Sequence, residues 1–122
     1  MNTVSIRGAI TADNNISSDI SAATVELFEK IIETNNINID DIIHIIFSVT
    51  KDLNAIYPAK ALRDKFDLSD TPLFCVQEAD IHGALEKCIR VLILTNSDLA
   101  KKEVKHVYLK GAKVLRPDLS DN

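Results

Sequence analysis

Hydrophobic residues fall into alternating and helical patterns along the chain, which predict a mixture of strands and helices. Residues 3–10 (TVSIRGAI) are β-branched and apolar, which favours a strand, with Gly8 at a bend or a close backbone approach. Turn-forming residues follow and end at Ser17 and Ser18, the candidate caps of a helix. Apolar residues then recur at helical spacing over residues 18–35, so we expect a helix there.

The middle of the chain holds three further apolar segments. Residues 42–50 (IIHIIFSVT) and 88–95 (CIRVLILT) are apolar on both faces, which is typical of buried strands, and residues 71–78 (TPLFCVQE) form another strand candidate. Pro58 suits the first position of a short helix, whose apolar side is formed by Ala59, Leu62 and Phe66.

The C-terminal third predicts shorter elements. A short helix is expected to begin at Ser97 or Asp98, and residues 106–115 are expected to form one or two strands around Gly111. The whole chain, residues 1–122, is therefore predicted to be a single domain with about five strands and two or three helices. Because the buried strands outnumber the helices that could cover them, we expect another subunit to cover part of the sheet.

Composition narrows the class of protein. Hydrophobic residues make up 46% and charged residues 26%, as in an ordinary folded protein, and the formal net charge of −4 argues against nucleic-acid binding. The N-terminus lacks the features of a secretory signal, and no apolar run is long enough to span a bilayer. We therefore expect a cytoplasmic protein that does not bind membranes, in which Cys75 and Cys88 are free thiols.

The arginines occupy unusual places. Only four residues are arginine against ten lysines, and they are Arg7, Arg63, Arg90 and Arg116. Arg7 and Arg90 are each flanked by apolar residues inside predicted strands, where a guanidinium is costly unless an anion meets it. Two interpretations stay open. Either the arginines bind the carboxylates of a ligand through their planar fork, or they pair with an internal acid such as Glu78 or Asp80.

Other chemistry-bearing residues give weaker signals. The cysteines and histidines lack the spacing of a zinc site, and no nucleophile elbow, phosphate loop or dinucleotide fingerprint is present. His44 is expected to be a core histidine, and Cys75 a buried or site-lining thiol in preference to a nucleophile. Glu78 ends a predicted strand, where functional groups are often mounted. Tyr108 is either a tyrosine at the edge of the core or a hydroxyl donor to a ligand.

Six segments in order along the chain, IRGAIT, YPAKALR, CVQE, GALEKCIRVLI, HVYL and LRPDL, resemble the small monofunctional chorismate mutases of the trimeric, Bacillus-type family. The resemblance implies an α/β (α+β) fold, a mixed sheet packed with helices and assembled as a trimeric pseudo-barrel. It also implies a homotrimer with active sites between subunits. The reaction would convert chorismate to prephenate for phenylalanine and tyrosine biosynthesis, without metal or organic cofactor.

The resemblance also implies roles for individual residues. Arg90 would donate to the ether oxygen of the breaking bond, Arg7 and Tyr108 would hold the side-chain carboxylate, and Glu78 with Cys75 would bind the ring hydroxyl. The remaining substrate-binding positions would be Tyr57, Lys60, Arg63, Phe74, Val76, Gln77, Leu115 and Arg116, of which Arg63 and Arg116 would line the mouth. Tyr57, Phe74, Ala79 and His82 depart from the residues common in the family, which bears on the fit of the cleft.

Two other functions are compatible with this architecture. An imine or enamine hydrolase would also bind a carboxylate through an arginine, but it needs a group that activates water. A regulatory trimer would bind a small metabolite without turnover. The rearrangement of chorismate moves no proton and forms no covalent intermediate, so the lack of a triad or nucleophile motif agrees with the mutase interpretation.

Overall fold

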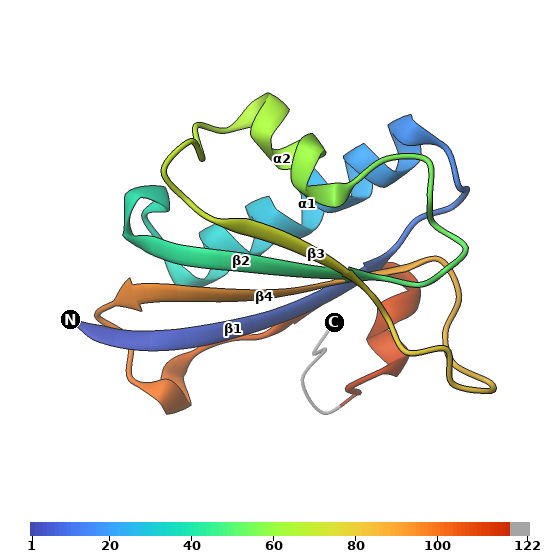
Figure 1. Cartoon of the computed structure of the whole chain (residues 1–122). Helices are drawn as coiled ribbons and strands as arrows, with labels where there is room; N and C mark the ends of the chain where they lie inside the picture. Colours follow the sequence, from blue (N-terminus) through green and yellow to red (C-terminus); the bar gives the residue numbers. More distant parts are fainter. Residues whose placement is uncertain (118–122) are drawn as a thin grey trace.

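A five-stranded mixed sheet runs through the computed structural model, which describes residues 1–117 (Figure 1). Its strands lie in the order β3-β2-β4-β1-β5, and β4 is antiparallel to both of its neighbours. The outer pairs, β2 with β3 and β1 with β5, are parallel. The strands are β1 (Asn2–Thr11), β2 (Ile42–Val49), β3 (Leu73–Gln77), β4 (Cys88–Ser97) and β5 (Val107–Tyr108).

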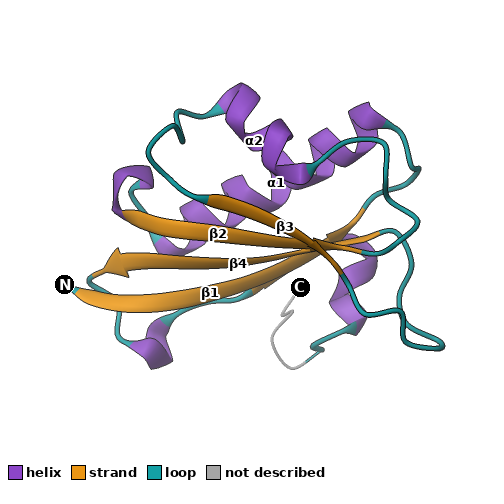
Figure 2. Ribbon diagram, in the orientation of Figure 1, coloured by secondary structure: helices purple, strands orange, loops and turns teal. Residues whose placement is uncertain are grey.

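Both α-helices cover the same face of this sheet, as Figure 2 shows. They are α1 (Ser17–Asn35) and α2 (Pro58–Lys65), and α2 begins at Pro58 as predicted. The prediction that Ser17 or Ser18 caps α1 was wrong: the cap position is Ile16, and no side chain caps it. Both serines already lie within the first helical turn, so their hydroxyls are past the cap position. None of the helices among the described residues has the length and apolarity needed to cross a membrane.

Three short 3-10 turns complete the chain: η1 (Ile39–Asp41), η2 (Lys101–Glu103) and η3 (Lys110–Val114). Two predictions hold only in part here. The short helix expected after Ser97 forms as η2, but it begins at Lys101, because Ser97 continues the β1–β4 pairing opposite Asn2. Residues 106–115 contain one strand, β5, but none around Gly111, because Lys110 takes a positive φ of 51° that ends the extended run and leads into η3.

The core lies between the sheet and the two helices. Alternate residues of each strand face the helices, and this layer contains fully buried Ile and Phe side chains of β1, β2 and β4 packed on Leu27, Phe28, Ile31 and Leu62. The opposite face, called the open face below, is covered at one end by the described part of the chain. There η3 contributes the buried Ala112 to a small cluster with Ala9, Cys88 and Tyr108.

The rest of the open face exposes apolar side chains. Phe74 and Val76 of β3 are 64% and 40% exposed, and Leu92 of β4 is 36% exposed. Adjacent apolar surface of this kind on a sheet is typical of a region that another molecule covers. The sequence predicted too few helices to cover both faces of the sheet. In the single chain this apolar part of the open face is indeed exposed.

Gly8 makes the close approach that its place in the first strand predicted. A Cβ at this position would lie 2.7 Å from Cδ1 of the fully buried Ile31 and 3.1 Å from the carbonyl oxygen of Val107. We expect Gly8→Ala to lower the free energy of unfolding by about 1–3 kcal/mol, because Ile31 is fully buried and the Val107 carbonyl belongs to the paired backbone of β5. Urea denaturation measures this change. The control Ser5→Ala, on an exposed position of the same strand, should stay within about 0.5 kcal/mol of the parent, and an equal loss in both variants would contradict the packing argument.

Candidate active site

Arg90 lies near the centre of the sheet and points to the open face. Its neighbours Ile89 and Val91 face the helices and are buried, so alternation along β4 turns the guanidinium the other way. Ala9 of β1 and Ser48 of β2 are its cross-strand partners. The Arg90 side chain is 41% exposed in the single chain, so it lies on the surface of the sheet and not in the hydrophobic core.

Glu78 is the immediate partner of Arg90. The Arg90 Nε atom lies 2.9 Å from Glu78 Oε2, yet this nitrogen is buried and makes no hydrogen bond, so its N–H does not point at the carboxylate. Ser48 Oγ donates to the other carboxylate oxygen at 3.1 Å. The internal ion pair considered from the sequence therefore exists, but without the paired hydrogen bonds that lock an Arg–carboxylate bridge.

A first cavity, called the arginine cavity, lies on the open face and has a volume of about 490 Å³. Arg7 and Arg90 both line it, because Arg7 lies two residues from Ala9 on β1 and Ala9 is opposite Arg90. It contains the predicted site residues Arg7, Arg90, Tyr108, Leu115 and Arg116 together. Three guanidinium groups thus line the cavity, and a positively charged site of this size suits a compact dianion.

Arg7 and Tyr108 differ in burial inside the arginine cavity. Arg7 is exposed, so the expectation of a guanidinium enclosed by apolar residues fails for this chain alone. The reason is geometric: Ile6 and Gly8 face α1, while Arg7 faces the open side. Tyr108 is 7% exposed and packs in the cluster under η3 while lining the cavity, so it is a core-edge tyrosine at a place from which a ligand contact stays a prediction.

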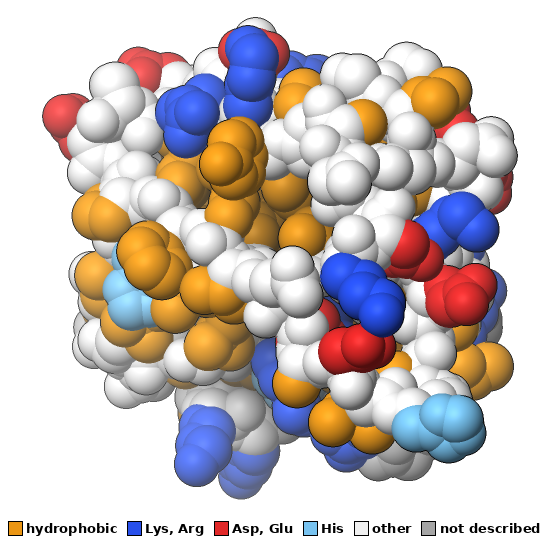
Figure 3. All heavy atoms as spheres, turned by 45° about the vertical axis from the view of Figure 1, so that its right-hand side comes forward, with side chains coloured by type: hydrophobic (Ala, Val, Ile, Leu, Met, Phe, Trp, Pro, Cys, Tyr) orange, Lys and Arg blue, Asp and Glu red, His pale blue; other side chains and the backbone are white. Residues whose placement is uncertain are grey.

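A second cavity, called the edge cleft, lies between β3 and the segment that leads into α2, and has a volume of about 660 Å³. Apolar side chains gather around a hollow on the face shown in Figure 3. The edge cleft contains a second set of predicted site residues, Tyr57, Lys60, Cys75, Val76 and Gln77. Tyr57 is 70% exposed, so within one chain its ring has little to pack against.

The predicted site residues are thus divided. One group lines the arginine cavity and another lines the edge cleft, while Arg63 and Phe74 are exposed and line neither. Glu78 stands between the groups, since its carboxylate contacts Arg90 although its backbone follows β3. The chain beyond Pro117, which includes the end of the LRPDL motif, lies outside the described residues.

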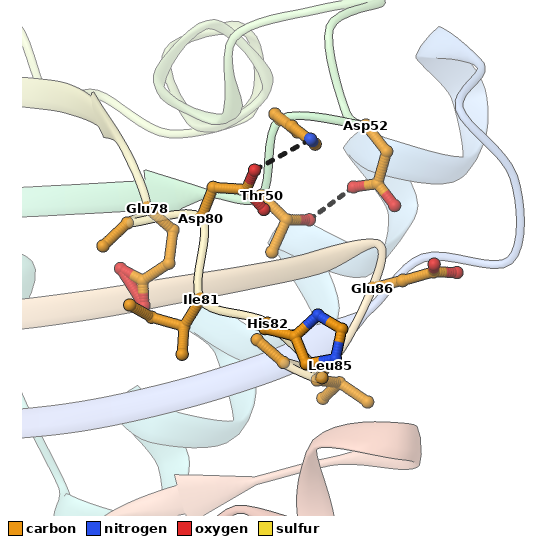
Figure 4. Close-up of a pocket in the computed structure, with 12 residues that line it drawn as sticks. Thr50, Asp52, Glu78, Asp80, Ile81, His82, Leu85 and Glu86 are labelled. Atoms are coloured by element: carbon orange, nitrogen blue, oxygen red, sulfur yellow. Dashed lines mark hydrogen bonds and ion pairs between the residues drawn. The ribbon is translucent and has the colours of Figure 1, made fainter.

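A third hollow, shown in Figure 4, is lined by the loop that joins β3 to β4 and by residues 50–52 after β2. Two of its acidic side chains tie these segments together: Asp52 accepts hydrogen bonds from Thr50 and from the backbone of Lys87, and Asp80 pairs with Lys51 at 2.9 Å. Across residues 1–117 no group of three His, Cys, Asp or Glu side chains is arranged to hold a metal ion. This hollow is also lined by Ala79, His82 and Glu78, and Glu78 connects it to the arginine cavity through its contact with Arg90.

The two cysteines lie on the sheet, Cys75 on β3 and Cys88 at the start of β4. Cys75 and Cys88 are both free, as predicted. Burial raises the pKa of the Cys88 thiol, and the nearby Arg90 charge opposes the rise only in part, so this thiol stays protonated and packs against Ala9.

His44 is half-buried beside a register shift in β2. It is therefore not the core histidine that the apolar run predicted, because alternation with the buried Ile45 places it on the open face.

Comparisons with known proteins identify the family. Residues 3–119 match the model of the family described as chorismate mutase type I. The chain belongs to this family. It is 43% identical to the chorismate mutase AroH of Bacillus subtilis (strain 168) over 115 residues, which cover 94% of this chain and 91% of that protein. It is 42% identical to the chorismate mutase AroH of Thermus thermophilus, with 93% of each chain covered.

The fold agrees with that of a family member of known structure. A chorismate mutase structure from Clostridium thermocellum superposes with a TM-score of 0.87 at 50% identity, covering 90% of this chain and 97% of that one. The α+β architecture with a mixed sheet, predicted from the resemblance, is thereby confirmed.

Sequence reasoning missed two residues that contact the predicted site residues in this type I chorismate mutase fold, Ser48 in the wall of the arginine cavity and His106 behind Arg7. Ser48 binds Glu78 beside Arg90, and His106 accepts a hydrogen bond from the backbone of Arg7. The signal for Ser48 was available, because it is a polar residue within an otherwise apolar strand. His106 gave no such signal, since its contact joins residues 99 positions apart.

Proposed function

We propose that the protein is a chorismate mutase, which rearranges chorismate to prephenate. The observation that carries this proposal is the placement of Arg90 and Arg7 in one cavity on the open face, in a chain that belongs to the type I family. Chorismate is a compact dicarboxylate, and the two guanidinium groups supply the matching charge. Family membership disfavours the hydrolase and the regulatory trimer.

Arg90 is proposed to be the catalytic charge. In the rearrangement a carbon–oxygen bond breaks while a carbon–carbon bond forms within one molecule, and negative charge grows on the ether oxygen. A fixed cation in a site shielded from water stabilises that oxygen more in the transition state than in the ground state. Arg90 suits this role because the two flanking strands fix its backbone and the Glu78 carboxylate lies beside its Nε at 2.9 Å.

Arg7, Tyr108 and Glu78 are proposed to hold the substrate around Arg90. Arg7 would bind the side-chain carboxylate, with the Tyr108 hydroxyl beside it, and the Glu78 carboxylate would accept the ring hydroxyl. Holding the side chain of chorismate over its ring lowers the entropic part of the barrier. Arg116 and Arg63 would attract the dianion from the rim.

We further propose that a complete site needs two chains in a homotrimer. Two facts support this assembly: the site residues divide between two cavities of one chain, and the open face exposes Phe74, Val76 and Leu92. Packing one chain's edge cleft against another chain's arginine cavity would bring the two groups together and bury that apolar surface. It would also remove water from around Arg90, which strengthens its electrostatic effect.

A turnover assay with the purified protein tests this function. We expect the absorbance of chorismate to fall and prephenate to form at the same rate, with a metal chelator present throughout. The Arg7→Ala variant should turn chorismate over with a KM raised at least tenfold, because the carboxylate loses a charge-assisted partner. Tight binding of chorismate or prephenate without any turnover would instead favour the regulatory function.

A further inference from the structure

The pairing between β1 and β5 stops where the substrate-binding arginine begins. Only Gly8 with Val107 and Ala9 with Tyr108 are paired along these strands. At Arg7 the place of the next strand residue is taken by a side chain, because Nδ1 of His106 accepts the backbone N–H of Arg7 at 2.9 Å. The titratable imidazole of His106 therefore takes the place of a backbone acceptor at Arg7, whose guanidinium belongs to the proposed site.

This hydrogen bond fixes β1 from the β5 side. Backbone groups of alternate residues in a strand point to the same neighbour, and the carbonyl of Ala9 accepts the N–H of Leu109 on that side. The N–H of Arg7 points to the same side and so turns away from Leu92, its cross-strand partner on β4. The imidazole is thus the acceptor that holds the N–H of Arg7 on this edge, next to the paired Gly8 and Val107.

The imidazole is itself held in place from both sides. Asn35 at the end of α1 is 4% exposed, and its side-chain amide accepts the Lys105 N–H at 2.8 Å and donates to the Lys105 carbonyl at 2.9 Å. The next residue, Val107, is buried and paired in β5. Because the residues before and after His106 are clamped, the position of the ring is part of the fold.

The surroundings of the ring favour its neutral form. Burial is the main cause that lowers the pKa of His106, and the positive charges of Arg7 on β1 and Arg116 after η3 lower it further. From α1 the side chain that reaches this segment is the uncharged Asn35. The neutral ring, with its hydrogen on Nε2, is also the form that can accept the Arg7 N–H at Nδ1.

We propose that His106 is a positioning residue: its neutral imidazole holds the backbone of Arg7, and so the direction of that guanidinium, and protonation releases it. The consequence for catalysis rests on the proposed function of Arg7 as the carboxylate anchor. Because Arg90 does the electrostatic work, loss of this hydrogen bond affects the KM for chorismate and leaves kcat nearly unchanged.

Two substitutions separate the hydrogen bond from the bulk of the ring. His106→Asn keeps an acceptor near the place of Nδ1 but does not titrate, while His106→Leu keeps volume and loses the acceptor. We expect His106→Asn to keep the parent KM within about threefold and His106→Leu to raise it roughly tenfold, with kcat within about threefold in both. Equal KM values in the two variants would overturn the proposal.

The pH dependence supplies a second readout. As the pH falls through the pKa of His106, the KM of the parent protein should rise, whereas that of His106→Asn should stay flat over the same range. Because the folded-state pKa lies below that of the unfolded chain, the parent should also lose stability relative to His106→Asn as the pH drops below about 6.5. Parallel profiles for the two proteins would contradict the role of the ring.

An NMR titration tests the contact without any enzyme assay. The amide resonance of Arg7 should shift, and its hydrogen exchange accelerate, with the same midpoint as the ring resonances of His106. An Arg7 amide that ignores this titration would sink the proposal whatever the kinetics show. If the amide follows the ring but chorismate is not converted, the positioning of Arg7 stands and the proposed function fails.

Discussion

Mixing two inactive variants should restore chorismate mutase activity. The first variant, Arg90→Ala, removes the catalytic charge from the arginine cavity. The second, Tyr57→Asp combined with Lys60→Glu, changes the charge of the edge cleft by about three units at neutral pH. Both edge positions are exposed, Tyr57 at 70% and the Lys60 side chain at 55%, so the substitutions should spare the fold. The added carboxylates repel a dianion, and we expect kcat/KM to fall roughly 100-fold.

The recovery follows from the division of the site between chains. If each site takes its arginine cavity from one subunit and its edge cleft from the next, random mixing places two intact halves together in about one quarter of the sites. Refolding an equal mixture of the two variants should therefore give about 25% of the parent activity per chain. A mixture no more active than the average of its parts would show that the site lies within one chain.

Replacing Arg90 should abolish most of the activity without unfolding the protein. We expect Arg90→Ala to lower kcat roughly 10²–10³-fold, as removal of a transition-state donor does in comparable sites. Arg90→Lys should recover little of this loss, because an ammonium group lacks the planar fork that can hold two oxygens at once. Steady-state kinetics at saturating chorismate measure the effect, and thermal unfolding checks the fold.

The Arg90 variants need a control for the loss of a cation. Lys65 on α2 pairs with Glu29 at 3.4 Å on the helical face, away from both cavities. Lys65→Ala should keep kcat within about twofold of the parent. A similar loss of kcat in Lys65→Ala and Arg90→Ala would mean that general charge, and not the place of Arg90, determines the rate.

The sequence predicted the long elements well because their patterns repeat many times. The helix over residues 17–35 and the strand over residues 88–97 each contain several turns or alternations, so one polar residue does not hide the period. The short C-terminal elements were predicted only in part, because single residues decide where they begin and end. The positive φ of Lys110 ends the extended run after β5. Ser97 pairs with Asn2 at the end of β4 and does not cap a helix.

The candidate site was predictable where a charged side chain interrupts an apolar strand. Arg7 and Arg90 stand out because a guanidinium is rare among apolar strand residues, and the structure places both in one cavity. Contacts between distant segments were not predictable from the residues alone. Ser48 with Glu78, and His106 with Arg7, depend on strand register, which no local pattern encodes.

The most direct measurement replaces Arg90 with citrulline, a neutral residue of the same shape that keeps most of the hydrogen-bond donors. The proposed mechanism assigns catalysis to the positive charge at this position and substrate anchoring to Arg7. We therefore predict a kcat at least about 100-fold below that of the same protein made with arginine, and a KM changed much less. A kcat close to that of the arginine protein would contradict electrostatic catalysis by Arg90.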